Sequence, residues 1–539
     1  MKKLFLLLLV CGTVWSALAQ QKQPQANNWS WGGPLHPNQA AFDVKHYTLR
    51  LKVNPEQKSL SGSNEITLEV KQPLDQILLD LIQAYQVTGV RVDGQETTFT
   101  RSGDQLTVQL PTSKAANQRL KLTVSYAGST PEAVRPPWQG GFTWSKDSNG
   151  NHWMGLSSQN EGGKIFMPCK DHPSDKAEEG VSLFITVPAP YQVAANGVLQ
   201  TISNKSDQLT YHWVTDYPIT NYGINFTMGK FHKEERQYNT INRHKTPMVI
   251  YVLEENAAKA KSLMDILEVS VRTREKYFGE FPFWKEKIGV VETPYLGMEH
   301  QTINAYGNHF KYTKVGDLDF DWLLYHELGH EWWGNKVNVK DWADFWIHEG
   351  LCTYGDWLFT REHAGEEAYR AQVLGAATGI QNKQPIVPGE NLGSDEVYQG
   401  DIYSKGAYLL HTLRYVMGDS LFFPALKGFA TEPAFTYQHQ VTTQDFVTYF
   451  SQALGQDLKP LLDFYLRTTN LPEVEVQPQA DNQYAIRLTN TSFALPMDVK
   501  TDQGTQRVQL SSQPVVVTSA QAPVIDPDGW YLKRVSSKQ

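Results

Sequence analysis

Cysteine and positive charge are both scarce in this chain. Its 539 residues include three cysteines, and the formal net charge at pH 7 is −8. So few cysteines cannot form a disulfide framework in a protein of this size. Cys169 and Cys352, which lie beyond the first twenty residues, could form one disulfide or remain as two buried thiols, and we favour thiols. An acidic chain with a pI near 6.0 has no basic footprint for nucleic acid, so we expect no nucleic-acid partner.

Long apolar runs are absent after residue 20, so we expect no transmembrane segment in the mature chain. The first residues carry Lys2 and Lys3, then an apolar run over residues 4–10, then Ala17-Leu18-Ala19. This arrangement is typical of a secretory signal peptide, and its apolar core is too short for a membrane anchor. We therefore predict a signal peptide over residues 1–19 and an exported protein that is periplasmic or secreted.

Alternation of apolar and polar residues dominates residues 20–230. Tyr47, Leu49, Leu51 and Val53 share one face of a predicted strand, and turn residues such as Asn196-Gly197 separate further short strands. With 40% hydrophobic residues, the chain can bury a core in each of several domains. The pattern predicts a β-rich N-terminal domain, built as a bent sheet or a sandwich.

The hydrophobic period becomes helical in residues 231–470. Leu263, Ile266, Leu267 and Val271 fit one face of a helix that ends near Gly279. A strand is predicted over residues 288–292, and further helices over residues 345–358 and 405–416. Residues 471–539 return to short strands separated by turns, which predicts a small C-terminal β-sandwich domain. The fold class is therefore α+β and multidomain.

A candidate metal site lies between residues 326 and 349. His326-Glu327-Leu328-Gly329-His330 contains H-E-x-x-H, and Glu349 follows after eighteen further residues. Histidines four apart lie one above the other on a helix, so both imidazoles can reach one ion. In a chain with fifteen histidines the pentapeptide alone arises by chance with odds of roughly a few per cent. With a carboxylate on the following helix, the set forms a zinc site with one open position.

The chain resembles the aminopeptidase N-type zinc peptidases, which are gluzincins with H-E-x-x-H, eighteen residues, then Glu. Residues 326–335 resemble the family's helix ending in Trp/Phe-Gly-Asn, residues 344–350 its Asp-x-Trp-Leu-x-Glu-Gly, and residues 168–173 its Pro-Cys-x-Asp-Glu-Pro. The resemblance covers about residues 43–470. It implies a saddle-shaped N-terminal β domain and a thermolysin-like α/β zinc catalytic domain. Residues 471–539 offer no counterpart to the large C-terminal helical domain of many members, so we expect a more open cleft.

The resemblance also implies roles for single residues. One zinc ion would be held by His326, His330 and Glu349. Glu327 would act as general base and then as general acid, and Tyr403, which precedes x-Lys-Gly, would donate a hydrogen bond to the oxyanion.

Substrate selection would depend on residues 296–300, which resemble the family's Gly-x-Met-Glu-Asn and include Gly297 and Met298. Glu299 would bind the free α-amine of a peptide, so that only the first peptide bond reaches the zinc ion. Leu296 replaces the family's glycine, and His300 replaces asparagine and could add positive charge near the amine at low pH.

A second amine contact comes, in the family, from a Gln or Glu of an N-terminal loop. Gln159 and Glu161 match this position, and we favour Glu161. The resemblance therefore implies a metallo-aminopeptidase whose partners are peptides with a free N-terminus.

Three other functions are compatible with parts of this pattern. An epoxide hydrolase/aminopeptidase of the same resemblance relies on a capping helical domain with basic residues, which this chain lacks. A non-catalytic peptide-binding scaffold predicts loss of a ligand or of the base, yet His326, Glu327, His330 and Glu349 are all present. A thermolysin-like endopeptidase would have no use for Glu299.

Overall fold

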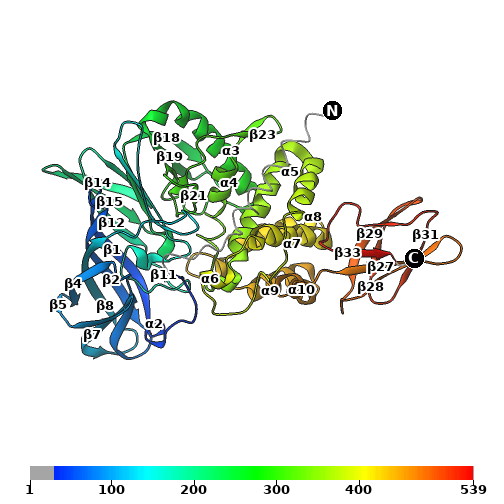
Figure 1. Ribbon diagram of the computed structural model, residues 1–539, viewed down its shortest axis with the longest axis horizontal. Helices are drawn as coiled ribbons and strands as arrows, with labels where there is room; N and C mark the ends of the chain where they lie inside the picture. The colour runs from blue at the N-terminus through cyan, green and yellow to red at the C-terminus, as the bar shows by residue number, and fades with distance from the viewer. Residues whose placement is uncertain (1–28, 538–539) are drawn as a thin grey trace.

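The computed structural model describes residues 29–537, and the predicted signal peptide lies outside them. Figure 1 shows three regions along the long axis: a β-rich N-terminal region, a central region in which the helices gather, and a small β region at the C-terminal end. This arrangement confirms the predicted α+β multidomain class. Within the described residues, no helix is both long enough and apolar enough to cross a membrane.

The N-terminal region is built on a sheet of eight strands, in the order β14 (Val198–Lys205), β15 (Gln208–Thr215), β12 (Val181–Pro188), β1 (Phe42–Asn54), β2 (Ser59–Val70), β8 (Arg119–Ser129), β4 (Tyr85–Val92) and β5 (Gln95–Glu96). Only β1 and β12 run parallel among these neighbours. Tyr47, Leu49, Leu51 and Val53 are all buried on one face of β1, which confirms the predicted alternation.

Two further sheets of three or four strands, and a short pairing of β11 (Lys176–Ala177) with β16 (Ile219–Thr220), complete this region. One has the order β13 (Gln192–Ala195), β17 (Phe226–Gly229), β10 (His152–Ser157) and β9 (Gly141–Lys146). The other has the order β3 (Leu74–Asp80), β7 (Gln105–Lys114) and β6 (Phe99–Ser102). The loop that carries Gln159 and Glu161 leaves β10 directly, so this sheet positions it against the central region.

The central region begins with a five-stranded sheet in the order β18 (Phe231–Asn239), β19 (Lys245–Leu253), β20 (Ile288–Glu292), β22 (Asn304–Tyr306) and β21 (Gly297–Met298). The predicted helix is α3 (Ala260–Phe278), which ends at Gly279 with a φ of 85°. The predicted strand over residues 288–292 is β20. The short edge strand β21 carries the residues that resemble the substrate motif.

Helices follow the sheet: α4 (Trp322–Gly329), α5 (Trp346–Ala377), α7 (Asp401–Met417), α8 (Asp419–Thr431), α9 (Thr443–Leu454) and α10 (Lys459–Leu466). Two predicted boundaries are wrong. Helix α5 does not end at residue 358 but continues to Ala377, with a kink at Gly365 where φ is 88°. Helix α7 begins at Asp401 rather than at Lys405, so Tyr403 lies in its first turn.

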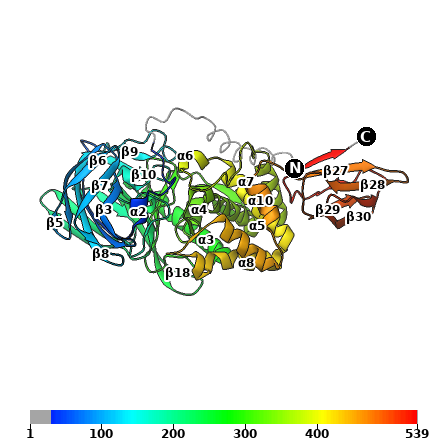
Figure 2. The ribbon, with the colours of Figure 1, turned by 90° about the horizontal axis from the view of Figure 1, so that it is seen from below.

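The C-terminal region consists of two small sheets, which Figure 2 shows as two layers. One has the order β31 (Val515–Thr518), β28 (Gln483–Leu488), β27 (Glu473–Pro478) and β33 (Arg534–Ser537); the other has the order β30 (Gly504–Leu510), β29 (Leu495–Thr501) and β32 (Val524–Ile525). Trp530 stacks on His411 and Tyr415 of α7, with ring centroids 4.4 and 5.1 Å apart. These aromatic contacts join the region to the same helix that carries Tyr403.

Both described cysteines are free. Cys169 lies in the N-terminal region and Cys352 on α5, and both are buried. The prediction of two buried thiols is therefore confirmed.

Candidate active site

The histidine pair is presented by the short helix α4. Asp321 caps its N-terminus, where its Oδ1 accepts hydrogen bonds from the backbone N–H groups of Leu323 and Leu324, each at 3.1 Å. Both leucines are buried, so the apolar face of the helix is fixed against the core. His326 lies in the last turn and His330 is the C-cap residue, still with helical dihedral angles. The helix therefore aims both imidazoles to one side.

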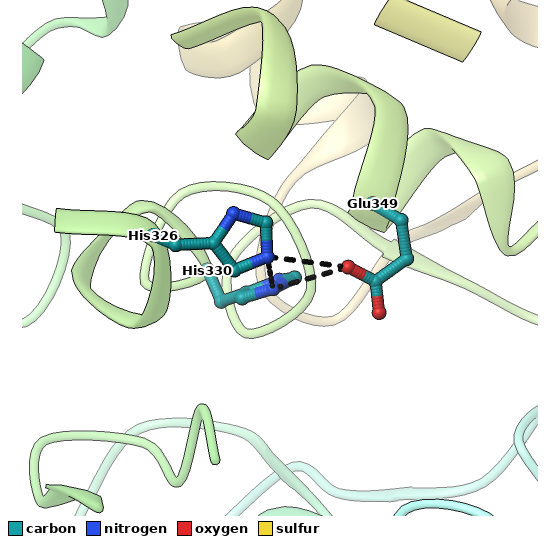
Figure 3. Close-up of side chains that lie close together, drawn as sticks. All are labelled: His326, His330 and Glu349. Carbon is teal, nitrogen blue, oxygen red and sulfur yellow. Dashed lines mark hydrogen bonds and ion pairs between the residues drawn. The ribbon is translucent and has the colours of Figure 1, made fainter. Parts of the chain in front are cut away.

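The three predicted metal ligands lie together, as Figure 3 shows. The Nε2 atoms of His326 and His330 are 3.3 Å apart, and Glu349 Oε2 lies 3.5 and 3.4 Å from them. His330 Nδ1 donates to the backbone oxygen of Trp333 at 2.8 Å, and His326 Nδ1 lies 2.8 Å from Asp356 Oδ2. Because these contacts occupy both Nδ1 atoms, both Nε2 atoms face the shared centre.

The donor set fits a zinc ion. Within the described part of the chain, Glu349 Oε2 is buried and forms no hydrogen bond. A buried carboxylate oxygen of this kind is costly unless a cation compensates its charge. Two imidazole nitrogens and one carboxylate are a common zinc ligand set, and they leave a fourth position open.

A contact between two glycines holds α5, which carries Glu349, against α7, which carries Tyr403. A Cβ atom on Gly350 of α5 would lie 3.1 Å from the Cα of Gly406 of α7, and a Cβ atom on Gly406 would lie 3.1 Å from the Cα of Gly350. The backbones of the two helices therefore touch where they cross. Tyr403 is buried, its ring centroid lies 6.0 Å from that of His326, and its hydroxyl bonds the hydroxyl of Tyr398 at 2.8 Å.

Two more carboxylates lie beside the ligands. Oxygen atoms of Glu299 and Glu327 and a ring nitrogen of His330 all lie within 4.8 Å of one another. Burial raises the pKa of Glu327 to about 8; the two imidazoles oppose this shift, and the neighbouring carboxylates of Glu299 and Glu349 add to it. Burial also raises the pKa of Glu299. The structure thus brings the predicted base and the predicted amine-binding group together at the metal centre.

The edge strand β21 passes directly over the predicted base. A Cβ atom on Gly297 would lie 2.6 Å from Glu327 Oε1, so a larger residue here would displace the carboxylate of the predicted base. Met298 is buried beside it. An edge strand next to the centre has free backbone groups that can hold an extended peptide.

The N-terminal loop reaches the centre through Gln159. Gln159 Nε2 donates to Glu299 Oε1 at 2.7 Å and to Glu349 Oε1 at 3.3 Å. Glu161 is instead turned towards Gly140, whose backbone N–H donates to its Oε1 at 2.7 Å, and burial raises its pKa to about 8. The structure therefore places Gln159 on the predicted amine-binding carboxylate, whereas the substrate role predicted for Glu161 stays a prediction.

The expectation that His300 adds positive charge near the amine at low pH is wrong. Burial lowers the pKa of His300 to about 3, and Asn225 Nδ2 lies 3.0 Å from its Nε2. The imidazole is fully buried and stays neutral over the pH range in which an exposed histidine would titrate. This position therefore contributes packing and a hydrogen bond.

Sequence reasoning missed three residues that support the centre. Asp356 contacts His326 and lies seven residues after Glu349, so two helical turns of spacing could have indicated it. Tyr398 contacts Tyr403 but precedes α7, where no period applies. Arg274 pairs with Asp356 at 2.7 Å from a third helix, and no local pattern marks it.

Comparisons with known proteins agree with this geometry. The Peptidase M1 N-terminal domain matches residues 43–222, and the Peptidase family M1 domain matches residues 271–465. The puromycin-sensitive aminopeptidase of Caenorhabditis elegans is 22% identical over 467 residues, which cover 82% of this chain and 48% of the relative. The leucyl aminopeptidase of Saccharolobus solfataricus is 21% identical over 461 residues, which cover 80% and 54%. The chain thus spans about half the length of these curated relatives.

Solved structures match over almost their whole length. An M1 zinc metallopeptidase from Deinococcus radiodurans is 25% identical, with a TM-score of 0.70, and the match covers 82% of this chain and 96% of the other. A mutant of that peptidase bound to a Tyr-Ser-Ala substrate is also 25% identical, with a TM-score of 0.69 and coverage of 80% and 95%.

Proposed function

Because the chain belongs to the M1 family of zinc peptidases, we propose that it is an aminopeptidase that removes the N-terminal residue of peptides with a free α-amine. The observation that carries this proposal is the buried carboxylate of Glu299, which lies beside Glu327 and His330. A carboxylate held there can pair with an α-ammonium group and place only the first peptide bond at the metal centre.

Each of the chain's own groups then has a role. A zinc ion at this site supplies Lewis acidity, which polarises a carbonyl and lowers the pKa of water. Glu327 takes a proton from the attacking water and passes it to the leaving amine. The hydroxyl of Tyr403 donates a hydrogen bond to the oxygen that becomes negative in the transition state. Gln159 holds Glu299 in place through its 2.7 Å hydrogen bond.

The alternatives receive less support. An endopeptidase gains nothing from a buried carboxylate at the position of Glu299, and a scaffold has no need of Glu327 beside a complete ligand set. The epoxide hydrolase hypothesis relies on a capping helical domain. In the described residues, α10 is the last helix, and strands follow it to residue 537.

A panel of aminoacyl fluorogenic substrates, compared with their N-acetylated forms, tests the proposal. Hydrolysis should require the free amine, should stop when a chelator removes the metal, and should return when zinc is added back. Equal cleavage of N-acetylated peptides would favour an endopeptidase, and no cleavage of any substrate by zinc-loaded protein would favour a scaffold.

We also propose export from the cytoplasm, on the basis of the sequence pattern in residues 1–19. N-terminal sequencing of protein purified from the native host should begin at Gln20. Protein that retains residues 1–19 would contradict this.

A further inference from the structure

A buried arginine joins three helices beside the metal ligands. Arg274 of α3 has 0% of its surface exposed. Its Nη2 donates to Asp356 Oδ1 at 2.7 Å and to the backbone oxygen of Tyr325 at 2.8 Å, and its Nη1 donates to the backbone oxygen of Cys352 at 3.3 Å. The guanidinium carbon also lies 3.9 Å from the centre of the Tyr325 ring. One cation on α3 therefore contacts both helices that supply metal ligands.

These contacts lie close to the ligands in the chain. Tyr325 directly precedes His326 on α4, and Cys352 lies three residues after Glu349 on α5. A shift of the guanidinium would therefore move the backbone from which two of the three ligands project.

Two glycines provide the space that the guanidinium occupies. A Cβ atom on Gly329 would lie 2.6 Å from Arg274 Cζ, and a Cβ atom on Gly355 would lie 1.7 Å from Arg274 Nη1. Gly329 stands between the two histidine ligands, and Gly355 directly precedes Asp356. Because any other residue at either position would collide with the guanidinium, α4 and α5 leave a gap that fits this side chain.

Asp356 connects the arginine to a metal ligand. One carboxylate oxygen accepts from Arg274, while the other lies 2.8 Å from His326 Nδ1. A partner on this nitrogen fixes the tautomer and the orientation of a metal-binding imidazole. The Asp356 side chain retains 21% exposure, so its rotamer depends on the partner that holds its other oxygen.

We propose that Arg274 is a positioning residue for the metal centre, which sets zinc affinity by holding Asp356 against His326. This inference rests on the proposed function only in taking zinc as the ion. Lysine cannot replace the arginine, because one ammonium group lacks the planar fork that reaches the carboxylate and two backbone oxygens together. Arg272 offers a matched control, because it lies on the same helix with its side chain 58% exposed and its ion pair is with Glu268 of the same helix, away from the metal ligands.

The test is the zinc dissociation constant of the purified full-length protein, measured by competition with a chromogenic chelator. Arg274→Lys and Asp356→Asn should each weaken zinc binding about 10–100-fold, the usual cost of losing such a partner. Arg272→Lys should stay within about twofold of the parent protein. The absorption bands of the cobalt-substituted protein should shift in the first two variants, because the His326 ring changes its orientation, and should not shift in the control.

The double variant tests whether Arg274 acts through Asp356. Arg274→Lys combined with Asp356→Asn should bind zinc no more weakly than the weaker single variant. Losses that multiply in the double variant, or unchanged zinc affinity in a folded Arg274→Lys protein, would overturn the proposal. If Arg274→Lys does not fold, Asp356→Asn, which keeps the side-chain volume, serves as the test by itself. Unchanged zinc affinity and unchanged cobalt bands in Asp356→Asn would then overturn the proposal. The parent protein could also prove to cleave no peptide while Arg274→Lys and Asp356→Asn still bind zinc more weakly than it does. That result would support the positioning role and contradict the aminopeptidase proposal.

Discussion

Two buried groups of charged residues, one in the N-terminal region and one in the central region, differ in how their charges are balanced. In the N-terminal region, Lys164 Nζ lies 2.9 Å from Asp171 Oδ2, and Lys170 Nζ lies 2.9 Å from Asp175 Oδ1. The side chains of both aspartates are fully buried. Each carboxylate therefore has a cation from the chain itself.

In the central region, the three glutamates at the candidate metal centre, Glu299, Glu327 and Glu349, lack such partners among the described residues. Across residues 29–537, no lysine or arginine forms an ion pair with Glu299, Glu327 or Glu349, and the ion-pair partners of Glu349 are the two ligand histidines. Buried charge that the chain does not neutralise must be compensated by a metal ion, a substrate cation or a proton. The comparison indicates that the N-terminal group serves folding, whereas the central group serves binding and chemistry.

Loss of the base should give the largest effect and should separate chemistry from metal binding. Glu327→Ala should lower kcat by roughly 10²–10⁴-fold, because no other group can move the proton of the attacking water. Zinc content, measured by atomic absorption, should not change. Glu367→Ala, at an exposed position on α5, should leave kcat unaltered. Comparable kcat values for Glu327→Ala and the parent would remove Glu327 from the mechanism.

Breaking the N-terminal group should affect stability alone. Lys164→Met leaves the carboxylate of Asp171 buried without its cation, which should lower the free energy of unfolding by about 3–5 kcal/mol. Urea denaturation measures this change, and zinc affinity should stay constant. Lys58→Met removes an exposed ion pair to Glu132 and should cost less than about 1 kcal/mol. Equal losses in both variants would contradict the distinction between the two groups.

The amine-binding role predicts a smaller effect that is confined to substrate recognition. Glu299→Ala should raise KM for substrates with a free α-amine about 10–100-fold, which corresponds to the loss of one charge-assisted hydrogen bond. Zinc content should be retained. If KM rises equally for N-acetylated substrates, or does not rise at all, Glu299 does not recognise the amine.

The smallest effect should appear at His300, in the pH dependence of stability. Its pKa is lowered from 6.5 to about 3, so between these values the unfolded chain binds more protons than the folded chain. Stability should therefore fall as pH drops below 6.5, by up to about 1.4 kcal/mol per pH unit from this residue. His300→Asn should make this slope shallower in urea titrations between neutral pH and about pH 4. His232→Asn, at a partly exposed position whose side chain is 39% exposed, is the control. Equal slopes for the parent and His300→Asn would contradict the burial argument.

Much of the fold could be predicted from the periodicity of apolar residues. The two errors in the predicted helix boundaries have local causes. The strand alternation of β1 and the apolar face of α3 predicted both elements, because each buries one face against the core. The end of α5 was misplaced because its second half, beyond the kink at Gly365, is only partly buried and carries a weak apolar pattern. The start of α7 was misplaced because its first turn holds Tyr403, whose side chain packs at the metal centre rather than following a surface pattern.

The sequence by itself indicated the histidine pair of the candidate metal site, since the relative positions of His326 and His330 depend on the rise of a single helix. Only the tertiary structure decided which polar groups meet them. Gln159 reaches Glu299 across 140 positions of the chain, and Arg274 reaches Asp356 across 82. The neutral state of His300 likewise depends on burial by distant segments. Spacing along a helix follows from backbone geometry, whereas these pairings depend on how separate elements pack, which no local pattern of residues encodes.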